Sequence, residues 1–297
     1  MTTTANPLLH PWNGPFGLPP FAEVRAGHFE PAFDVAMREH LAEVDAIGGA
    51  ASAPTFDNTI GALDRAGRLF DRVGGLFHNL ASSETSPQLQ GVERLMAPRL
   101  AAHDSRLYMN GPLFERIRSL HDRRADLALS GEQRRVLERY HTDFVRAGAR
   151  LDAGAQARHA ELMERLADLT TRFGQNVLAD ESNFRLLLEG EADFAGLPDF
   201  VRAATRQAAS ERGIADAGLV TLSRSHIVPF LTFSERRDLR EAAWRAWVTR
   251  GEHAGESDNR AIAAEILALR LERARLHGYA SYADFVLADT MAASQDA

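Results

Sequence analysis

Cysteine is absent from the 297-residue sequence, so disulfides, thiol nucleophiles and cysteine-bound zinc or iron–sulfur clusters are excluded. A strong charge imbalance is also missing, because 34 basic and 41 acidic residues give a net charge of -7. This mildly acidic balance argues against nucleic acid or an anionic membrane as the main partner. No apolar run reaches the length of a membrane span, and residues 1–20 lack the basic start and apolar centre of a secretion signal. The sequence therefore predicts a cytoplasmic protein with neither nucleic-acid nor membrane partners.

The common catalytic signatures are missing as well. There is no Gly-x-Ser-x-Gly elbow, no phosphate loop ending in Gly-Lys-Ser/Thr and no Gly-x-Gly-x-x-Gly motif. A zincin helix needs two histidines four residues apart, with a glutamate between them to activate water. No two of the 11 histidines are closer than 12 positions, and none directly precedes a glutamate. A local helical zinc site is therefore excluded, and we assign no catalytic or metal-binding residue to this chain.

Helical periodicity is the main feature that the sequence does contain. Hydrophobic residues make up 45% and charged residues 25%, as in ordinary globular proteins, and the chain is long enough for a sizeable core. Apolar residues recur at steps of three and four, which indicates amphipathic helices. The predicted helices cover residues 29–48, 57–77, 87–109, 113–120, 136–145, 155–178, 198–212, 240–250, 259–277 and the stretch from 282 onward. Residues 1–27 are rich in Pro and Gly, which indicates an extended segment that wraps a surface.

Three short apolar runs between residues 183 and 231 favour strands instead. They are residues 183–189, 219–222 and 227–231. The last two could pair as a hairpin, with Pro229 restricting its strand to a sheet edge. The predicted fold is mainly α, an elongated antiparallel helical array with a small β-hairpin or short strands around residues 183–231. No linker requires a second domain, so residues 1–297 are predicted to form one lobe.

An ordered set of short motifs indicates a family. The motifs are Phe56-Asp57-Asn58-Thr59-Ile60, Tyr108-Met109-Asn110-Gly111-Pro112, Trp244 and Trp247 ahead of Thr249-Arg250, Asp258-Asn259-Arg260, Leu267-Ala268-Leu269-Arg270, Leu276-His277-Gly278-Tyr279, Tyr282-Ala283 and Met291-Ala292. In this order they resemble the thimet oligopeptidase family of zinc metallopeptidases, and within it the bacterial peptidyl-dipeptidase and oligopeptidase A branch. The resemblance covers nearly the whole chain.

The resemblance implies that this chain is the N-terminal helical lobe of a larger enzyme. In that family two lobes enclose a narrow channel that admits short unstructured peptides, and the later lobe carries the His-Glu-x-x-His helix. The resemblance therefore implies zinc in the full-length enzyme but none bound by this chain, which is predicted to be inactive alone. Its implied partners are the missing C-terminal catalytic lobe and short peptides. The alternative is a stand-alone helical module that binds peptides or proteins without catalysis.

Some residues could still serve a site, although each has a plainer interpretation. His159 with Glu161 and Glu164 is the best local metal candidate. Glu161 points away from His159 on a helix, so a solvated helix face is favoured. The pairs His103-Asp104 and His121-Asp122 are no better, because adjacent residues diverge on a helix.

His226 and Arg250 are candidates for peptide contacts. His226 could face a peptide cleft, but an exposed turn histidine is favoured. Arg250 could receive a peptide carboxylate in a bidentate pair, but a structural ion pair with Glu241 or Glu252 is favoured.

Trp244 and Trp247 lie three residues apart on one predicted helix. Core packing is favoured for both, although one of them could meet the missing lobe. Gly74-Gly75 lies within an amphipathic helical pattern, which favours close helix packing over a ligand loop.

Overall fold

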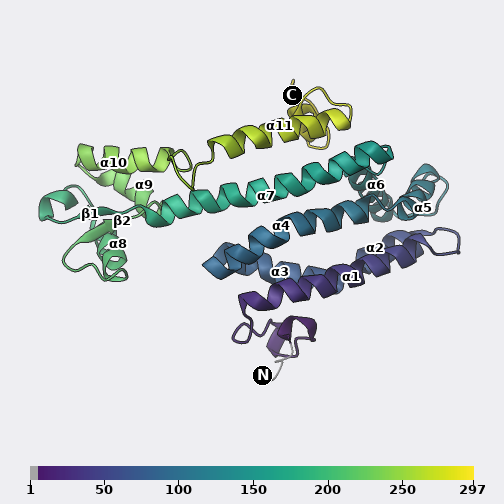
Figure 1. Cartoon of the computed structure of the whole chain (residues 1–297), viewed down its shortest axis with the longest axis horizontal. Helices are drawn as coiled ribbons and strands as arrows, with labels where there is room; N and C mark the ends of the chain where they lie inside the picture. The colour runs from purple at the N-terminus through teal and green to yellow at the C-terminus, as the bar shows by residue number, and fades with distance from the viewer. Residues whose placement is uncertain (1–5) are drawn as a thin grey trace. The chain divides into compact units, whose positions relative to one another are not determined.

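The structure is a computed structural model that describes residues 6–297, and it is mainly helical (Figure 1). The chain divides into two compact units. Unit 1 comprises Met1–Thr171 and Leu267–Ala297, and unit 2 comprises Arg172–Ile266. The boundaries fall inside α7 (Ala153–Asn183) and α11 (Arg260–Leu276). The predicted mainly α class is confirmed, as are short strands between residues 183 and 231. That the chain forms one lobe of a larger protein stays a prediction.

Unit 1 is a set of packed helices. Besides its parts of α7 and α11 it holds α1 (Phe29–Gly48), α2 (Gly61–Arg65), α3 (Arg68–Ser83), α4 (Pro87–Tyr108), α5 (Gly111–Asp122), α6 (Gly131–Arg146) and α12 (Tyr282–Leu287). Short 3-10 turns occur at Pro7–Leu9, Pro15–Gly17 and Ala26–His28, and a π-helical turn at Phe56–Ile60. Figure 1 shows α1, α3 and α4 side by side, and α1 packs against all of α3, α4 and α5.

The apolar stripe of α1 forms the first core of unit 1. Phe29 and Phe33 both contact Phe77 of α3 edge to face, with ring centroids 5.1 Å and 5.5 Å apart. Such pairs stabilise beyond the area that they bury. A Cβ atom on Gly74 would lie 4.0 Å from the Phe33 ring, which supports the packing interpretation of this glycine. Leu8 is fully buried in the same cluster, so the segment before α1 contributes to the core.

The predicted continuous helix over residues 57–77 is wrong, because the chain breaks at Gly67. Gly67 has a φ of 73°, in the left-handed region that favours glycine. Its N–H donates to a Glu43 carboxylate oxygen at 2.7 Å, and the His40 ring lies 3.0 Å from where a Cβ atom would be. The break is therefore held by contacts from α1. The apolar periodicity continues through it and gives no sign of it.

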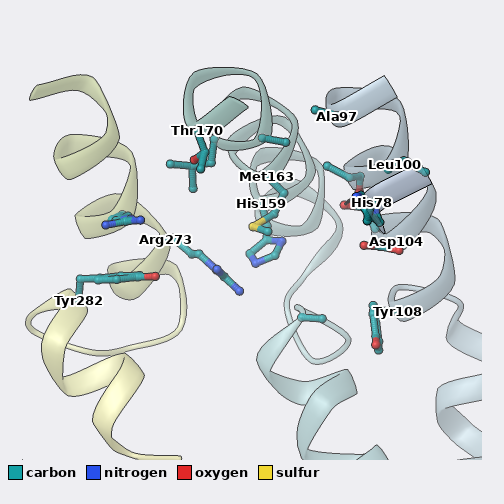
Figure 2. Close-up of a pocket in the computed structure, with 16 residues that line it drawn as sticks. His78, Ala97, Leu100, Asp104, Tyr108, His159, Met163, Thr170, Arg273 and Tyr282 are labelled. Atoms are coloured by element: carbon teal, nitrogen blue, oxygen red, sulfur yellow. Dashed lines mark hydrogen bonds between the residues drawn. The ribbon is translucent and has the colours of Figure 1, made fainter. Parts of the chain in front are cut away.

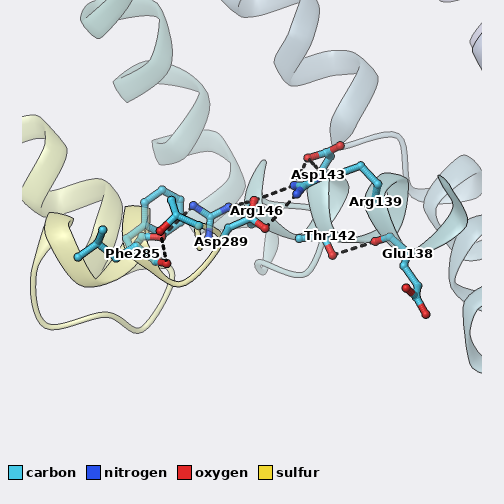
Figure 3. A network of polar contacts seen from close by, with 9 residues as sticks. Glu138, Arg139, Thr142, Asp143, Arg146, Phe285 and Asp289 are labelled. Atoms are coloured by element: carbon cyan, nitrogen blue, oxygen red, sulfur yellow. Dashed lines mark hydrogen bonds and ion pairs between the residues drawn. The ribbon is translucent and has the colours of Figure 1, made fainter. Parts of the chain in front are cut away.

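The end of the described chain is tied to α6 by a polar network (Figure 3). Arg139 pairs bidentately with Asp289, at 2.9 Å from Nη1 and 2.8 Å from Nη2, and also pairs with Asp143. Arg146 donates to the backbone carbonyl of Phe285 at 2.8 Å and lies over the Phe285 ring at 4.3 Å. These contacts bring α12 against α6 within unit 1.

Unit 2 contains the small sheet and the helices around it. Its elements are β1 (Leu186–Leu188), a 3-10 turn (Glu191–Phe194), α8 (Asp199–Ser210), β2 (Gly218–Val220), α9 (Arg224–Phe233), α10 (Arg237–Val248) and parts of α7 and α11. The strands are antiparallel, with Leu186 opposite Val220 and Leu188 opposite Gly218. Helices α8 and α9 pack on β2, and α10 packs on β1 and α9. Figure 1 shows these elements gathered together.

The predicted hairpin between residues 219–222 and 227–231 is wrong. Strand β2 pairs with β1, and residues 227–231 lie inside α9. Ile227 and Phe230 are buried at helical spacing while Val228 is exposed, so only one face of this apolar run is inside. Pro229 is tolerated within α9 at the cost of a backbone hydrogen bond. Periodicity cannot separate a short strand from a short buried helix, and the contacts of α9 decide it.

No helix in the part of the chain from residue 6 to residue 297 is both long enough and apolar enough to cross a membrane.

Candidate functional site

Unit 1 contains a hollow of about 570 Å³, which is the best candidate for a site. Pockets for small ligands usually fall between about 300 and 1,000 Å³. Figure 2 shows side chains from α3, α4, α7, α11 and α12 around it. The polar lining residues are His78, Asp104, Ser105, Tyr108, His159, Thr170, Arg270, Arg273 and Tyr282.

One side of the hollow is cationic. Arg273 extends from α11 toward His159 of α7 (Figure 2). Burial lowers the pKa of Arg273, and the nearby Arg146 guanidinium adds to this effect. The Arg273 guanidinium also lies 5.1 Å from the Phe285 ring centroid. Arg273 therefore carries a charge that the surrounding protein stabilises poorly.

His159 is a buried imidazole without hydrogen bonds. It is 2% exposed, and neither its Nδ1 nor its Nε2 has a partner within residues 6–297. Burial lowers its pKa to about 4, and the charges of Arg273 and His277 act in the same direction. Buried polar atoms almost always have partners, and leaving one unsatisfied costs roughly 1–3 kcal/mol. His159 is thus an exception of the kind found where a ligand or an ion binds.

The opposite side of the hollow is acidic. Asp104 lies on α4, with Tyr108 one turn further on and His78 of α3 on the same side of the hollow (Figure 2). Water reaches the Asp104 carboxylate, but the protein around it still raises its pKa to about 6 by burial. Burial likewise raises the pKa of Tyr108, and the Asp104 charge contributes. No arginine contributes to the pKa of Asp104, so Arg270 and Arg273 are too distant to neutralise it.

Apolar groups separate the two charged sides. They include Leu100 of α4, and Met163 and Leu166 of α7. A hollow with a cationic end, an apolar middle and an acidic end can bind a molecule that carries both charges.

The interpretation of His159 as part of a solvated helix face is wrong, because its side chain is only 2% exposed. His159 instead meets His277 edge to face, with 5.1 Å between ring centroids. Glu161 does point away, as predicted, and pairs with Arg158 at 2.9 Å. The sequence does not distinguish His159 from the other histidines on helices, because the residues that bury it lie far away along the chain.

The other histidine pairs are structural. His103 is buried, and its Nε2 lies 3.0 Å from Nδ1 of His40, while the neighbouring Asp104 faces the hollow. His121 stacks on His141 with 3.7 Å between centroids. His103 and Asp104 diverge, as predicted, but Nδ1 of His121 lies 3.7 Å from an Asp122 carboxylate oxygen, so the prediction that His121 and Asp122 diverge is wrong.

The favoured interpretation of His226 as an exposed turn residue is wrong. It lies in the first turn of α9, half-buried, with its Nδ1 3.1 Å from the Thr221 hydroxyl. Arg250 does form an ion pair, but with Glu181 of α7 and not with Glu241 or Glu252. Neither residue lines the hollow of unit 1.

The core prediction for Trp244 is wrong, because its side chain is 51% exposed. Trp247 is half-buried, packs against the core of unit 2, and is covered by the Arg250 guanidinium 3.6 Å from its ring centroid. Trp244 and Trp247 lie three residues apart on α10, but the helix turns only the Trp247 ring toward the core.

The residues present do not fit a catalytic zinc ion. Such a site takes three protein ligands, usually histidines and carboxylates. Across the described residues, no group of three or more His, Asp or Glu side chains is placed to hold a metal. We therefore derive no step of a reaction through a metal held by this chain.

From the sequence alone, Arg273 is not named, and Arg270, Tyr282 and Asp104 are not predicted to line a binding hollow. A weak signal was available, since Arg270, Arg273 and His277 recur at helical spacing beside the apolar stripe of α11. An arginine on the edge of such a stripe is usually solvated, and only packing shows that Arg273 is half-buried with its Nε enclosed.

Sequence comparisons extend the picture to known proteins. Residues 230–297 match the sequence profile of Peptidase family M3. Dipeptidyl carboxypeptidase from Escherichia coli (strain K12) is 34% identical over 295 residues, which cover 99% of this chain and 43% of that protein. Oligopeptidase A from the same strain is 30% identical over 291 residues, covering 97% of this chain and 42% of that protein. Probable cytosolic oligopeptidase A from Arabidopsis thaliana is 28% identical over 302 residues, covering 100% and 42%.

The chain therefore spans less than half the length of these curated relatives. The match runs along almost all of this chain, and its last part carries the family profile. The resemblance predicted from the ordered motifs is confirmed, since residues 230–297 match the Peptidase family M3 profile and nearly the whole chain is similar to dipeptidyl carboxypeptidase and oligopeptidase A.

Proposed function

We propose that this chain is the N-terminal, substrate-restricting lobe of a zinc-dependent peptidyl-dipeptidase or oligopeptidase that acts on short unstructured peptides. The observation that carries the proposal is the similarity of nearly the whole chain to less than half of each relative. In the intact enzyme zinc would polarise the scissile carbonyl, and a glutamate outside this chain would act as general base.

The partners under this proposal are a C-terminal catalytic lobe of the same polypeptide and short peptides, with no nucleic acid and no membrane. We further propose a cytoplasmic location. A relative from Arabidopsis thaliana is named cytosolic, although another from the same plant is named chloroplastic or mitochondrial.

The experiment compares this chain alone with a fusion. The fusion joins the chain to the part of the Escherichia coli dipeptidyl carboxypeptidase that lies outside the similarity. Zinc content is measured by mass spectrometry, and cleavage is followed with a short quenched-fluorescent peptide and with the same segment inside a folded protein. We expect no stoichiometric zinc and no cleavage by the chain alone, and zinc with cleavage of only the free peptide by the fusion.

Two results would contradict the proposal. One is stoichiometric zinc with peptide cleavage by the chain alone, which would place the active site in these residues. The other is a fusion that binds zinc but cleaves the folded substrate as fast as the free peptide, which would remove the restricting role.

A stand-alone helical binding module is the second candidate function. The charged hollow of unit 1 favours it, since binding needs no metal. It predicts peptide binding by the chain alone together with no gain of zinc or activity in the fusion.

A further inference from the structure

The cationic end of the hollow lacks an anion. The Nε of Arg273 is buried without a partner in the described part of the chain. None of the groups that shift its pKa is a carboxylate. An isolated buried charge costs more than a paired one, and arginine pairs best with a carboxylate that accepts two hydrogen bonds. A bound carboxylate would therefore relieve a cost that the folded chain carries.

His159 would serve the same carboxylate. Figure 2 shows the Arg273 guanidinium reaching toward the His159 ring, so a group held by one lies near the other. Both ring nitrogens of His159 are free of protein partners among residues 6–297, so either could donate to the ligand. The ring is 2% exposed, which means that its surroundings hold it in place. A fixed donor beside a half-buried guanidinium whose Nε is enclosed is a built site and not a chance surface contact.

The acidic end lacks a cation. Burial alone accounts for the raised pKa of Asp104. The titratable residues that line the same hollows as Asp104 are Asp71 and His78 from α3, Tyr108 from α4, His159 from α7, Arg270 and Arg273 from α11, and Tyr282 from α12. Asp71 and Tyr108 cannot offer it a positive charge at neutral pH. An ammonium group next to Asp104 would favour its ionised form.

The two ends belong to one hollow. Figure 2 places Asp104 and Arg273 on opposite sides, with Met163 between them. The volume of about 570 Å³ exceeds that needed for a single small ion. One molecule with a carboxylate at one end, an ammonium at the other and an apolar body between them matches all three regions. A short peptide with free termini has this chemistry.

We infer that the hollow of unit 1 binds a short zwitterionic peptide, with its C-terminal carboxylate at Arg273 and His159 and its α-ammonium group at Asp104. The inference rests on the proposed function for its ligand class and on the residues of the hollow for the two charged ends. It gives this chain a peptide site of its own, separate from any zinc site.

The test is calorimetric titration of the whole chain with one apolar tripeptide in four forms: free, N-acetylated, C-amidated and doubly blocked. We expect the free form to bind best at neutral pH. Each block should weaken binding about tenfold or more, which is the size of a lost hydrogen bond to a charged group. The penalty for N-acetylation should shrink near pH 5, since Asp104 is then largely protonated.

Variants assign the two ends. Asp104→Asn should remove the penalty for N-acetylation and leave the penalty for amidation. Arg273→Gln should do the reverse, with Arg273→Lys as a second variant that retains the charge if Gln destabilises unit 1. Asp126→Asn and Arg135→Gln change exposed residues outside the hollow and should leave all four affinities unchanged. Each penalty is measured within one variant, so a general loss of affinity does not obscure it.

The inference is overturned if the free and doubly blocked peptides bind equally, if the free peptide does not bind, or if Asp104→Asn keeps the full acetylation penalty. A failed titration leaves the zinc and cleavage results of the fusion standing. Conversely, a fusion without zinc leaves peptide binding by this chain standing, so the two proposals fail separately.

Discussion

The imidazole rings of His159 and His277 meet edge to face, with 5.1 Å between their centroids, beside the Arg273 guanidinium. Three groups that can carry positive charge are thus packed together, and burial lowers the pKa of each. Both histidine pKa values fall to about 4, so Arg273 alone is charged at neutral pH. This cluster links the fold of unit 1 to its behaviour in acid.

The stability of unit 1 should fall as the pH drops from about 6.5 toward 4. In that window the unfolded chain protonates its histidines while folded His159 stays neutral, so acid favours unfolding. The loss from His159 alone is on the order of 2 kcal/mol at pH 5. Urea unfolding at pH 5 and pH 8, followed by circular dichroism, should show a smaller pH effect in His159→Phe. The free energy of unfolding of His159→Gln should also depend less on pH, even if this variant is less stable overall. If neither variant changes the pH dependence of unfolding, His159 is not its source.

Gly251→Ala should destabilise unit 2. Gly251 has a φ of 76°, and a Cβ atom would lie 2.8 Å from the Asn259 side chain. The left-handed backbone and this clash together should cost roughly 2 kcal/mol or more. Two of the three tryptophans lie in unit 2, so in a Trp12→Phe background the fluorescence reports on that unit. Gly174→Ala, at a helical position with no atom within 4 Å, is the matched control and should cost nothing.

Asn259 should be needed as an amide. Its Nδ2 donates to the backbone carbonyl of Phe173 at 3.0 Å, and its Oδ1 accepts from Asn176 at 2.9 Å. Asn259 is 3% exposed, so Asn259→Asp would set a charged acceptor against the Phe173 carbonyl and cost about 1–3 kcal/mol. The cost should shrink at low pH, because a protonated carboxyl can donate to that carbonyl. Hydrogen exchange of the backbone amides in the α10–α11 connection measures this cost. Equal protection from exchange in the unchanged protein and in Asn259→Asp would contradict the role of the amide.

Arg139 and Asp289 should couple by about 1 kcal/mol, as expected for a bidentate pair that is partly exposed. Pairing with Arg139 lowers the pKa of Asp289, so its contribution is present at neutral pH and is lost when Asp289 protonates in acid. A double-mutant cycle with Arg139→Gln and Asp289→Asn measures the coupling. A coupling that does not weaken in high salt would argue against a mainly electrostatic origin.

The sequence alone determined the helical class and several helix ends. Ser281 caps α12 and Asn110 caps α5 through side chains that accept backbone N–H groups within three residues. Such signals are local, so they can be read without a structure. The motif order likewise indicated the family, and the histidine spacing excluded a helical zinc site, because both depend on residue identity and sequence distance alone.

Only the tertiary structure decided which side chains are buried and which partners they meet. Residues 227–231 are helical because α9 turns Ile227 and Phe230 into the core of unit 2, a choice that their apolar run leaves open. His159 and Arg273 are more than 100 positions apart, and a charged or polar residue on a helix carries no mark of the helix that will cover it. Burial and charge pairing are properties of packed surfaces, so the hollow and its two charged ends emerge only once the helices are assembled.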